Sequence, residues 1–133
     1  MGALDTNVLV RYLTRDDAGQ AAAARRLVDA ALERGETLFV PVTVCVELEW
    51  VLRSRFDFDK PAFIELLSTL LSTTELAFES EAAVEGALRL YESARADFAD
   101  CLHTALAFAA GSTPLWTFDR TASQIAGARA VPA

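Results

Sequence analysis

Short apolar segments alternate with longer stretches of helical periodicity along the whole chain, and this alternation constrains the fold more than any other feature. Residues 38–40 and 115–118 are three or four residues long and almost wholly apolar, as is typical of strands that are buried on both faces. Strands that alternate with helices form a parallel sheet with helices on both sides. The sequence therefore predicts a three-layer α/β/α fold with a central, mainly parallel sheet of about four to five short strands.

The expected strands are residues 3–4, 38–40, 75–78 and 115–118, with an edge strand at 128–131. The expected helices cover residues 8–13, 17–34, 43–56, 59–71, 80–91 and 97–110, with a short helix after Asp119. Residues with short polar side chains stand where these helices begin and are the expected N-caps: Asp16 or Asp17, Thr43, Asp59, Ser80 and Asp97.

Length and composition describe one soluble domain. The chain has 133 residues and is 53% hydrophobic, yet no apolar run reaches the roughly 20 residues that a membrane span requires. No signal sequence is visible at the start, and Cys45 and Cys101 are too few for a disulfide framework, so we expect reduced thiols and a cytoplasmic protein. A net charge of −7 argues against nonspecific coating of nucleic acid but is compatible with a carboxylate site that binds a cation.

Two aspartates directly follow apolar strands. Asp5 ends the first strand and Asp119 follows the segment 115–118. Ligands in parallel α/β folds bind beyond the carboxyl ends of the strands, so these two side chains are candidates for one shared site. Each also has a purely structural explanation, because Asp5 can cap the helix after it and Asp119 or Thr121 can cap the last short helix.

Two glutamates of the third helix differ in their expected environment. Glu47 falls within the apolar arc of that helix, which includes Trp50, whereas Glu49 falls outside the arc. Glu49 precedes Arg53 by four residues, so an exposed ion pair accounts for it. A buried carboxylate needs a cation or a proton, and Glu47 is therefore predicted to be a metal ligand, with an internal salt bridge as the alternative.

The helix from Asp97 is apolar around most of its circumference, so its few polar residues stand out. Asp100 and Thr104 share one stripe with Ala107, and His103 lies beside it. Asp97 suits a capping role better than Asp100 does, although a first-turn acid is also favoured by the helix dipole. His103 is expected to be a satisfied histidine near the core rather than a ligand or a general base.

Oxygen ligands without paired cysteines or histidines indicate Mg²⁺ or Mn²⁺ rather than structural zinc. A divalent cation next to a phosphoester acidifies water and stabilises charge on the transition state at phosphorus, so phosphoester hydrolysis is the expected chemistry.

Four segments together resemble the motifs of a known family. They are residues 4–13 (Leu-Asp-Thr-Asn-Val-Leu-Val-Arg-Tyr-Leu), 46–53 (Val-Glu-Leu-Glu-Trp-Val-Leu-Arg), 96–103 (Ala-Asp-Phe-Ala-Asp-Cys-Leu-His) and 117–120 (Thr-Phe-Asp-Arg). In order and spacing they resemble the PIN-domain ribonucleases, especially VapC-type toxins of bacterial toxin–antitoxin pairs. The resemblance spans nearly the whole chain and implies a single PIN-like nuclease domain over residues 1–133. Val46 departs from it, because many relatives carry a small hydroxyl residue there.

The resemblance also implies roles for individual residues. The catalytic and metal-binding acids would be Asp5, Glu47, Asp100 and Asp119, with Asp97 as an accessory acid. Asn7 and Thr117 match polar residues that hold the carboxylates in place. The resemblance further implies Mg²⁺-dependent endonucleolytic cleavage of RNA, with Mn²⁺ as a possible substitute, a homodimer, and inhibition by a cognate antitoxin.

Six basic side chains lie close to the acidic motifs in sequence and are candidates for contacting RNA phosphates: Arg11, Arg15, Arg53, Arg55, Lys60 and Arg120. An ordinary solvated charge explains each of them equally well. Arg120 is the strongest candidate because it adjoins Asp119, and Arg11 is the second.

Two other functions are compatible with parts of the sequence. An aspartate-nucleophile phosphatase also places an aspartate after its first strand, but it needs a second one two residues later, where this chain has Asn7. A PIN-like interaction module with little or no catalysis would retain the acids for folding with metal. The complete set of four acids favours the nuclease.

Overall fold

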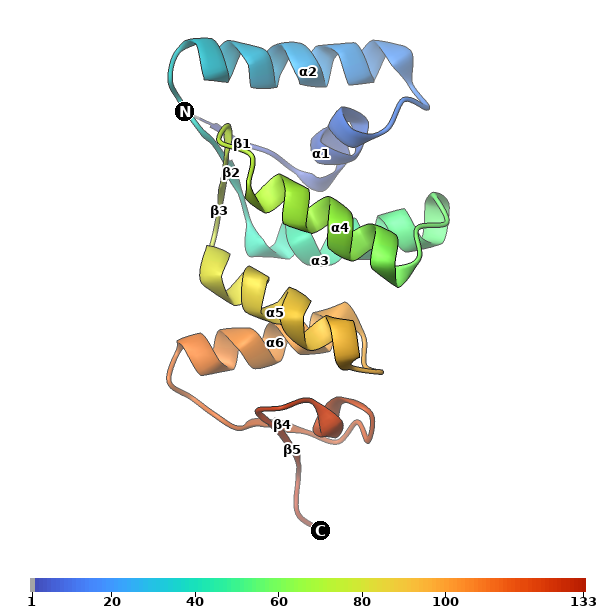
Figure 1. Ribbon diagram of the computed structural model, residues 1–133, viewed down its shortest axis with the longest axis vertical. Helices are drawn as coiled ribbons and strands as arrows, with labels where there is room; N and C mark the ends of the chain where they lie inside the picture. Colours follow the sequence, from blue (N-terminus) through green and yellow to red (C-terminus); the bar gives the residue numbers. More distant parts are fainter. Residues whose placement is uncertain (1) are drawn as a thin grey trace.

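Short strands and longer helices alternate in the computed structural model, which describes residues 2–133 (Figure 1). The strands are β1 (Gly2–Ala3), β2 (Leu38–Val40), β3 (Leu76–Phe78), β4 (Leu115–Thr117) and β5 (Ala128–Ala130). The helices are α1 (Thr6–Leu13), α2 (Ala18–Glu33), α3 (Val42–Arg55), α4 (Lys60–Leu71), α5 (Glu81–Ser93) and α6 (Phe98–Ala109), with a 3₁₀ helix, η1, at Ala122–Gln124. All the predicted elements are present, and only their ends differ.

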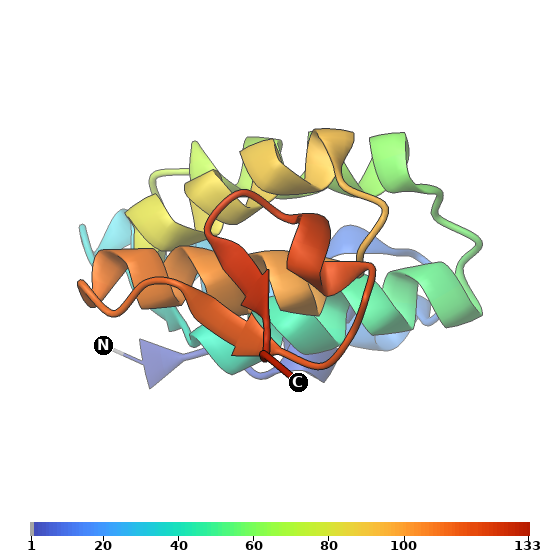
Figure 2. The ribbon, with the colours of Figure 1, turned by 90° about the horizontal axis from the view of Figure 1, so that it is seen from below.

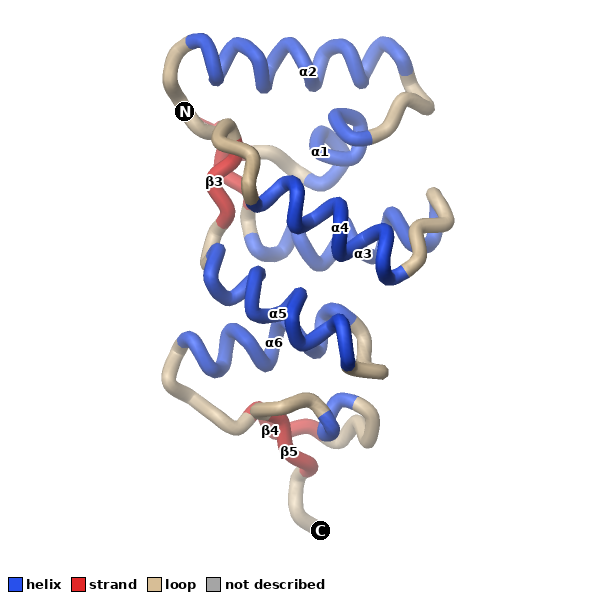
Figure 3. Tube along the Cα trace, viewed as in Figure 1, coloured by secondary structure: helices blue, strands red, loops and turns tan. Residues whose placement is uncertain are grey.

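The five strands are all parallel to their neighbours, as predicted, but they form two sheets instead of one. One sheet has the order β1-β2-β3, and the second consists of β4 and β5. The two groups of strands lie apart along the long axis of the molecule, with α5 and α6 between them (Figures 1 and 3). Seen from below, β4, β5 and η1 lie in front of α6 (Figure 2). The carboxyl ends of β1 and β4 are therefore not adjacent.

The N-caps agree with the sequence in part. Asp17 and Asp59 each accept a hydrogen bond from a backbone N–H of the first helical turn, as predicted. The prediction for Thr43 is wrong, because α3 begins one residue earlier and its Val42 N–H donates to the carboxylate of Glu79. Glu79 directly follows β3, so this cap comes from a residue that is far from α3 in the sequence.

Ser80 and Asp97 precede α5 and α6 as predicted, but neither side chain makes a capping hydrogen bond. Ser80 adopts a left-handed backbone conformation with φ of 52°. The carboxylate of Asp97 is consequently not engaged by the helix that it precedes.

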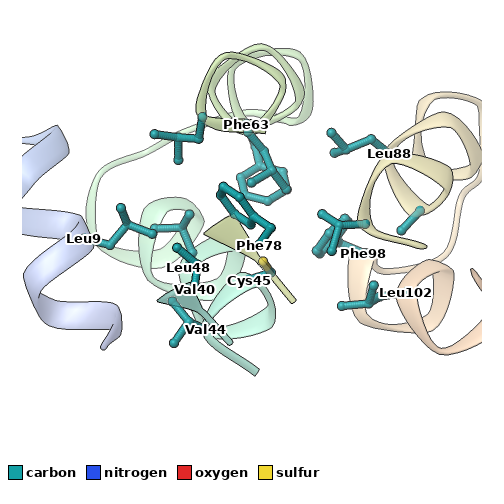
Figure 4. Close-up of a cluster of buried hydrophobic side chains, with 14 of the residues drawn as sticks. Leu9, Val40, Val44, Cys45, Leu48, Phe63, Phe78, Leu88, Phe98 and Leu102 are labelled. Carbon is teal, nitrogen blue, oxygen red and sulfur yellow. The ribbon is translucent and has the colours of Figure 1, made fainter. Parts of the chain in front are cut away.

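The core is built from side chains of the helices and of the three-stranded sheet (Figure 4). Phe78 of β3 lies at its centre, with Leu9 of α1 on one side and Leu102 of α6 on the other. Phe63 of α4 and Phe98 of α6 meet edge to face, with ring centroids 5.1 Å apart. Such aromatic pairs stabilise a core beyond the area that they bury.

Both cysteines are buried and free, in agreement with the expectation of reduced thiols. Burial raises the pKa of Cys45 to about 12 and that of Cys101 to about 11. Neither thiol is therefore a reactive nucleophile in the folded protein. Within residues 2–133, no helix combines the length and the apolar character needed to cross a membrane.

Lys60, the chain's only lysine, serves the fold and is not free to contact RNA. Its ammonium donates hydrogen bonds to the carbonyl oxygens of Tyr91 (2.9 Å) and Ala94 (2.6 Å) at the end of α5. It also lies 4.4 Å from the centroid of the Tyr91 ring. A cation at this position satisfies carbonyls that have no helical partner and interacts favourably with the helix dipole.

We predict that Lys60→Met lowers the free energy of unfolding by about 1.5–3 kcal/mol, the range for hydrogen bonds to a charged group. Urea denaturation followed by circular dichroism measures the effect. Arg15→Met is the matched control, since Arg15 is exposed and should leave stability nearly unchanged. Equal stability of the two variants would contradict the capping role.

Candidate functional site

Asp5 and Glu47 form the first acidic group of the candidate site. One oxygen of Asp5, Oδ1, accepts a hydrogen bond from the N–H of Val8 (2.9 Å), so this residue does cap α1. Oε1 of Glu47 accepts a hydrogen bond from the hydroxyl of Thr6 (2.8 Å). Thr6, the residue after Asp5, thus connects the start of α1 to α3. The sequence analysis did not identify this role of Thr6.

The environments of the two glutamates of α3 are the reverse of what the sequence predicts. Glu47 is exposed, whereas Glu49 is buried with 7% of its surface accessible. The predicted pair with Arg53 is present, with Arg53 Nε 2.8 Å from a Glu49 oxygen, although its acidic partner is not exposed. Because Trp50 is 55% exposed, the buried side of α3 is rotated away from the predicted one. Glu47 thus faces solvent, where a substrate has access.

Asp97, Asp100 and Asp119 form the second acidic group. The pKa of Asp100, which is partly buried at the start of α6, is raised first by burial, then by the negative charge of Asp119 and also by that of Asp97. The charge of His103 acts in the opposite direction. Burial and the negative charges of Asp119 and Asp97 therefore all disfavour the ionised form of Asp100, and a bound cation would favour it.

Local hydrogen bonds fix the position of Asp119. Its Oδ1 accepts from the N–H of Ala122 (2.8 Å), so the carboxylate caps η1. Its own N–H donates to the hydroxyl oxygen of Thr117 (3.0 Å). Thr117 therefore makes a hydrogen bond to the backbone of the turn that carries Asp119.

His103 is exposed, so the prediction that it lies near the core is wrong. It stands on the side of α6 that carries Asp100, whose pKa its charge lowers. The last turn of α6 also departs from the expected all-round burial, since Phe108 is 77% exposed.

The two acidic groups remain separate in this structure. No three histidine, cysteine, aspartate or glutamate side chains between residues 2 and 133 lie close enough together to hold one ion. Asp5 follows β1 and Asp119 follows β4, and these strands lie in different sheets. Helix α3, which carries Glu47, packs against both α1 and α6, so it connects the two groups.

Two cavities lie near these elements, and only the first is lined by one of the predicted acids, Glu47. The first has a volume of about 190 Å³ and is lined by Thr6, Asn7, Arg11, Glu47 and Arg55, among others. The second has a volume of about 390 Å³, lies between the end of α5 and η1, and is lined by Arg95, Thr121 and Gln124. Asn7 contributes to the first cavity beside Glu47, which is consistent with a supporting role there.

Several of the basic candidates have intramolecular partners. Arg11 donates to both carboxylate oxygens of Asp16 (2.8 and 2.7 Å) and to Gln20, which joins α1 to α2. Arg53 is bound to Glu49. Arg120 is exposed and has no ion pair within the described part of the chain. Arg120, Arg15 and Arg55 are thus the basic candidates without an ion pair to residues 2–133, whereas Arg11 is engaged by Asp16 and Gln20.

The predicted acids are of the chemical type that binds a divalent cation. All are carboxylates, the hard oxygen donors that Mg²⁺ and Mn²⁺ prefer, and Mg²⁺ uses only one or two of them together with water and substrate. Asp5 and Asp119 each use one oxygen for a cap and have a second oxygen without a hydrogen bond to residues 2–133. The repulsion around Asp100 provides the electrostatic reason for a cation to bind there.

Comparison with known proteins agrees with the motifs. A model of the PIN domain matches residues 3–128, and the chain therefore belongs to the PIN domain family. Together with the parallel strands, this match confirms the three-layer α/β/α fold. The chain is also 27% identical over 120 residues to the VapC ribonuclease of Aquifex aeolicus (strain VF5), covering 90% of this chain and 88% of that protein. It is thus a PIN-domain protein of the VapC type.

We expect Arg53→Met to destabilise the protein by about 1–2 kcal/mol, because the change leaves the buried Glu49 carboxylate without its cation; the exposure of Arg53 limits the loss. Arg55→Met is the control, since Arg55 lies on the same helix, is exposed and has no described ion pair. Thermal and urea unfolding of both variants provide the measurement. A control as unstable as Arg53→Met would refute the importance of the pair.

Proposed function

We propose that this chain is a Mg²⁺- or Mn²⁺-dependent endoribonuclease and the toxin of a type II toxin–antitoxin pair. The observation that supports it most directly is the crowding of Asp100 by Asp119 and Asp97 in a chain of the PIN domain family. The similarity to a VapC ribonuclease over 90% of the chain supports RNA as the substrate.

In this proposal Asp5, Glu47, Asp100 and Asp119 are the metal ligands of one site. Glu47 lies on α3, which contacts the helices that begin beside Asp5 and carry Asp100, so small movements of packed helices bring the two groups nearer. Relief of the repulsion at Asp100 favours that approach when a cation is present. Asp97, whose carboxylate caps nothing, is an accessory acid.

Each protein group then has a defined task in hydrolysis. A divalent cation supplies charge neutralisation at the phosphate and acidification of water. The caps of α1 and η1 hold Asp5 and Asp119 in fixed orientations, and Thr6 holds Glu47. Arg120, exposed beside Asp119, is placed to contact a neighbouring phosphate of the RNA.

A cognate antitoxin and a second copy of the chain are the proposed protein partners, and a cytoplasmic location is proposed with them. The exposed apolar side chains of α2, Leu27 (43%) and Leu32 (53%), support partner binding, because large exposed apolar groups are common at interaction surfaces. The two free thiols are compatible with a reducing compartment.

The first prediction of this proposal concerns the acids. Asp5→Asn and Asp100→Asn should each reduce Mg²⁺-dependent cleavage of single-stranded RNA by more than the roughly 10–100-fold that loss of a supporting group costs. Asp29→Asn, an exposed change on α2, should cleave like the parent protein. Gel analysis of labelled RNA with Mg²⁺, with Mn²⁺ and with EDTA gives the rates, and Mn²⁺ binding followed by electron paramagnetic resonance gives the affinity.

Cleavage that survives both EDTA and these substitutions would eliminate the metallonuclease. Mn²⁺ binding without any cleavage would favour the catalytically weak interaction module instead. Hydrolysis of small phosphomonoesters but not of RNA would favour the phosphatase.

The second prediction concerns Thr117. Thr117→Val keeps the shape of the side chain but removes the hydroxyl that accepts the Asp119 N–H, so cleavage should fall about 10–100-fold while the fold remains intact. Thr121→Val, in the following turn, is the control because its hydroxyl makes no hydrogen bond to the described residues. Equal rates for the two variants would exclude the positioning role.

A further inference from the structure

Two aromatic rings and an arginine are exposed on and next to the paired strands β4 and β5. Trp116 is 52% exposed, and Phe118, two residues further on, is 88% exposed. Phe118 is the first residue after the end of β4 at Thr117, so both exposed rings lie at the carboxyl end of this strand. Trp116 is in register with Arg129 of β5, which is also exposed. We call Trp116, Phe118 and Arg129 the aromatic face.

The opposite side of this small sheet is turned toward the protein. Leu115, Thr117 and Ala128 are partly buried, β4 contacts α6, and both strands contact η1 (Figure 2). Trp116 and Arg129 are therefore more accessible to a ligand than Leu115, Thr117 and Ala128 on the opposite side of these strands.

The aromatic face is cationic although the whole protein is acidic. The net charge of the chain is −7, yet none of the strand residues on this face is acidic, and Arg129 has no ion pair among residues 2–133. Arg120 lies two residues beyond Phe118 and likewise has no ion pair in the described part of the chain. A ligand with several negative charges and flat apolar groups is complementary to this surface, because the charges match the guanidinium groups and the flat groups match the rings.

The segment that carries Phe118 is held firmly. The N–H of Asp119 donates to the Thr117 hydroxyl, the N–H of Val131 donates to the Thr117 carbonyl, and Asp119 caps η1. The backbone on both sides of Phe118 is thus fixed, so little backbone entropy is lost when a ligand packs on its ring.

We infer that the aromatic face binds single-stranded RNA, with bases stacked on Trp116 and Phe118 and with Arg129 and Arg120 at the phosphates. Unpaired bases stack on aromatic side chains of exposed sheets in this way, and the interaction is available only in single strands. Phe118 adjoins Asp119, so the bound strand leads directly to the second acidic group. The inference rests on the proposed function and adds how that site recognises its substrate.

Binding is measured without cleavage, so that it is independent of the proposed chemistry. A fluorescein-labelled single-stranded RNA 12-mer is titrated in EDTA, with fluorescence anisotropy as the readout. Phe118→Ala and Trp116→Ala should each weaken binding by about 5- to 100-fold, the range that loss of one base–aromatic stack produces. Phe108→Ala is the matched control, because Phe108 is an equally exposed phenylalanine at the far end of α6 and should leave binding unchanged.

A modified RNA separates stacking from general loss of structure. An oligonucleotide with successive abasic sites should bind the parent protein as weakly as normal RNA binds Phe118→Ala, and the substitution should have no further effect on it. Arg129→Gln should weaken binding of both oligonucleotides and reduce the slope of the salt dependence by about one.

Tryptophan emission reports on the face directly. The chain has two tryptophans, so Trp50→Phe leaves Trp116 as the single emitter. Saturating RNA should quench this emission, whereas duplex RNA should not.

Equal binding of the parent protein and Phe118→Ala, together with equal binding of normal and abasic RNA, would overturn the inference. A change from dimer to monomer in the double variant Trp116→Ala/Phe118→Ala, with RNA affinity unaltered, would also overturn it and identify the face as a protein interface. Sedimentation velocity measures that outcome. If RNA binds as expected but metal-dependent cleavage is absent, the proposed function fails while the RNA-binding face stands.

Discussion

Packing between helices holds this fold together, because its strands are too short to do so. Each strand has two or three residues, so each pairing contributes only a few hydrogen bonds. The helices, in contrast, are joined by a continuous core in which Phe63, Tyr91 and Phe98 from α4, α5 and α6 contact one another edge to face. Lys60 strengthens the same region by closing the end of α5. The positions of the acidic residues therefore follow from which helices pack together, and much less from the sheets.

The acids at strand ends have two compatible roles. Asp5 and Asp119 each cap a following helix with one oxygen, which was the structural explanation that the sequence left open beside the functional one. A cap fixes the orientation of the carboxylate and leaves the other oxygen outward. Structural and functional explanations of such an aspartate consequently do not exclude each other, since the cap preorganises the ligand.

The sequence predicted the order and the type of the elements because each has a strong local signal. Strand 38–40 is bounded by Pro41, and Asp59 is followed by a proline in the first helical turn. It also placed Asp5, Asp100 and Asp119 at the ends of elements, where the structure has them. Local signals of this kind do not depend on the rest of the chain.

The sequence did not predict which side of α3 is buried or which strands pair with each other, and both have physical reasons. Helix α3 is apolar on most of its surface, so the inclusion or exclusion of Trp50 decides which side is buried, and Trp50 proved to be exposed. With Trp50 exposed, Glu47 is exposed and Glu49 is buried, which is the reverse of the prediction. The division of five strands into two sheets depends likewise on tertiary packing, because pairing of such short strands has little preference of its own. The cap of α3 comes from Glu79, which no pattern near Val42 announces.

Net charge is a poor guide to what this chain binds, because charge is distributed unevenly over its surface. Some of the acids that make the protein anionic are paired with arginines, as Asp16 and Glu49 are, and Asp100 lies within electrostatic range of Asp97 and Asp119. Arg120 and Arg129 are exposed close to Phe118 and Trp116 in sequence or register, and neither has an ion pair among the described residues. An anionic ligand approaching along that surface meets local positive charge, because interactions over more than about 10 Å are screened at moderate salt. The negative net charge of the protein is therefore compatible with RNA binding. An RNA strand on the aromatic face is attracted by the arginines nearest to it. It reaches the carboxylates only where a cation neutralises them.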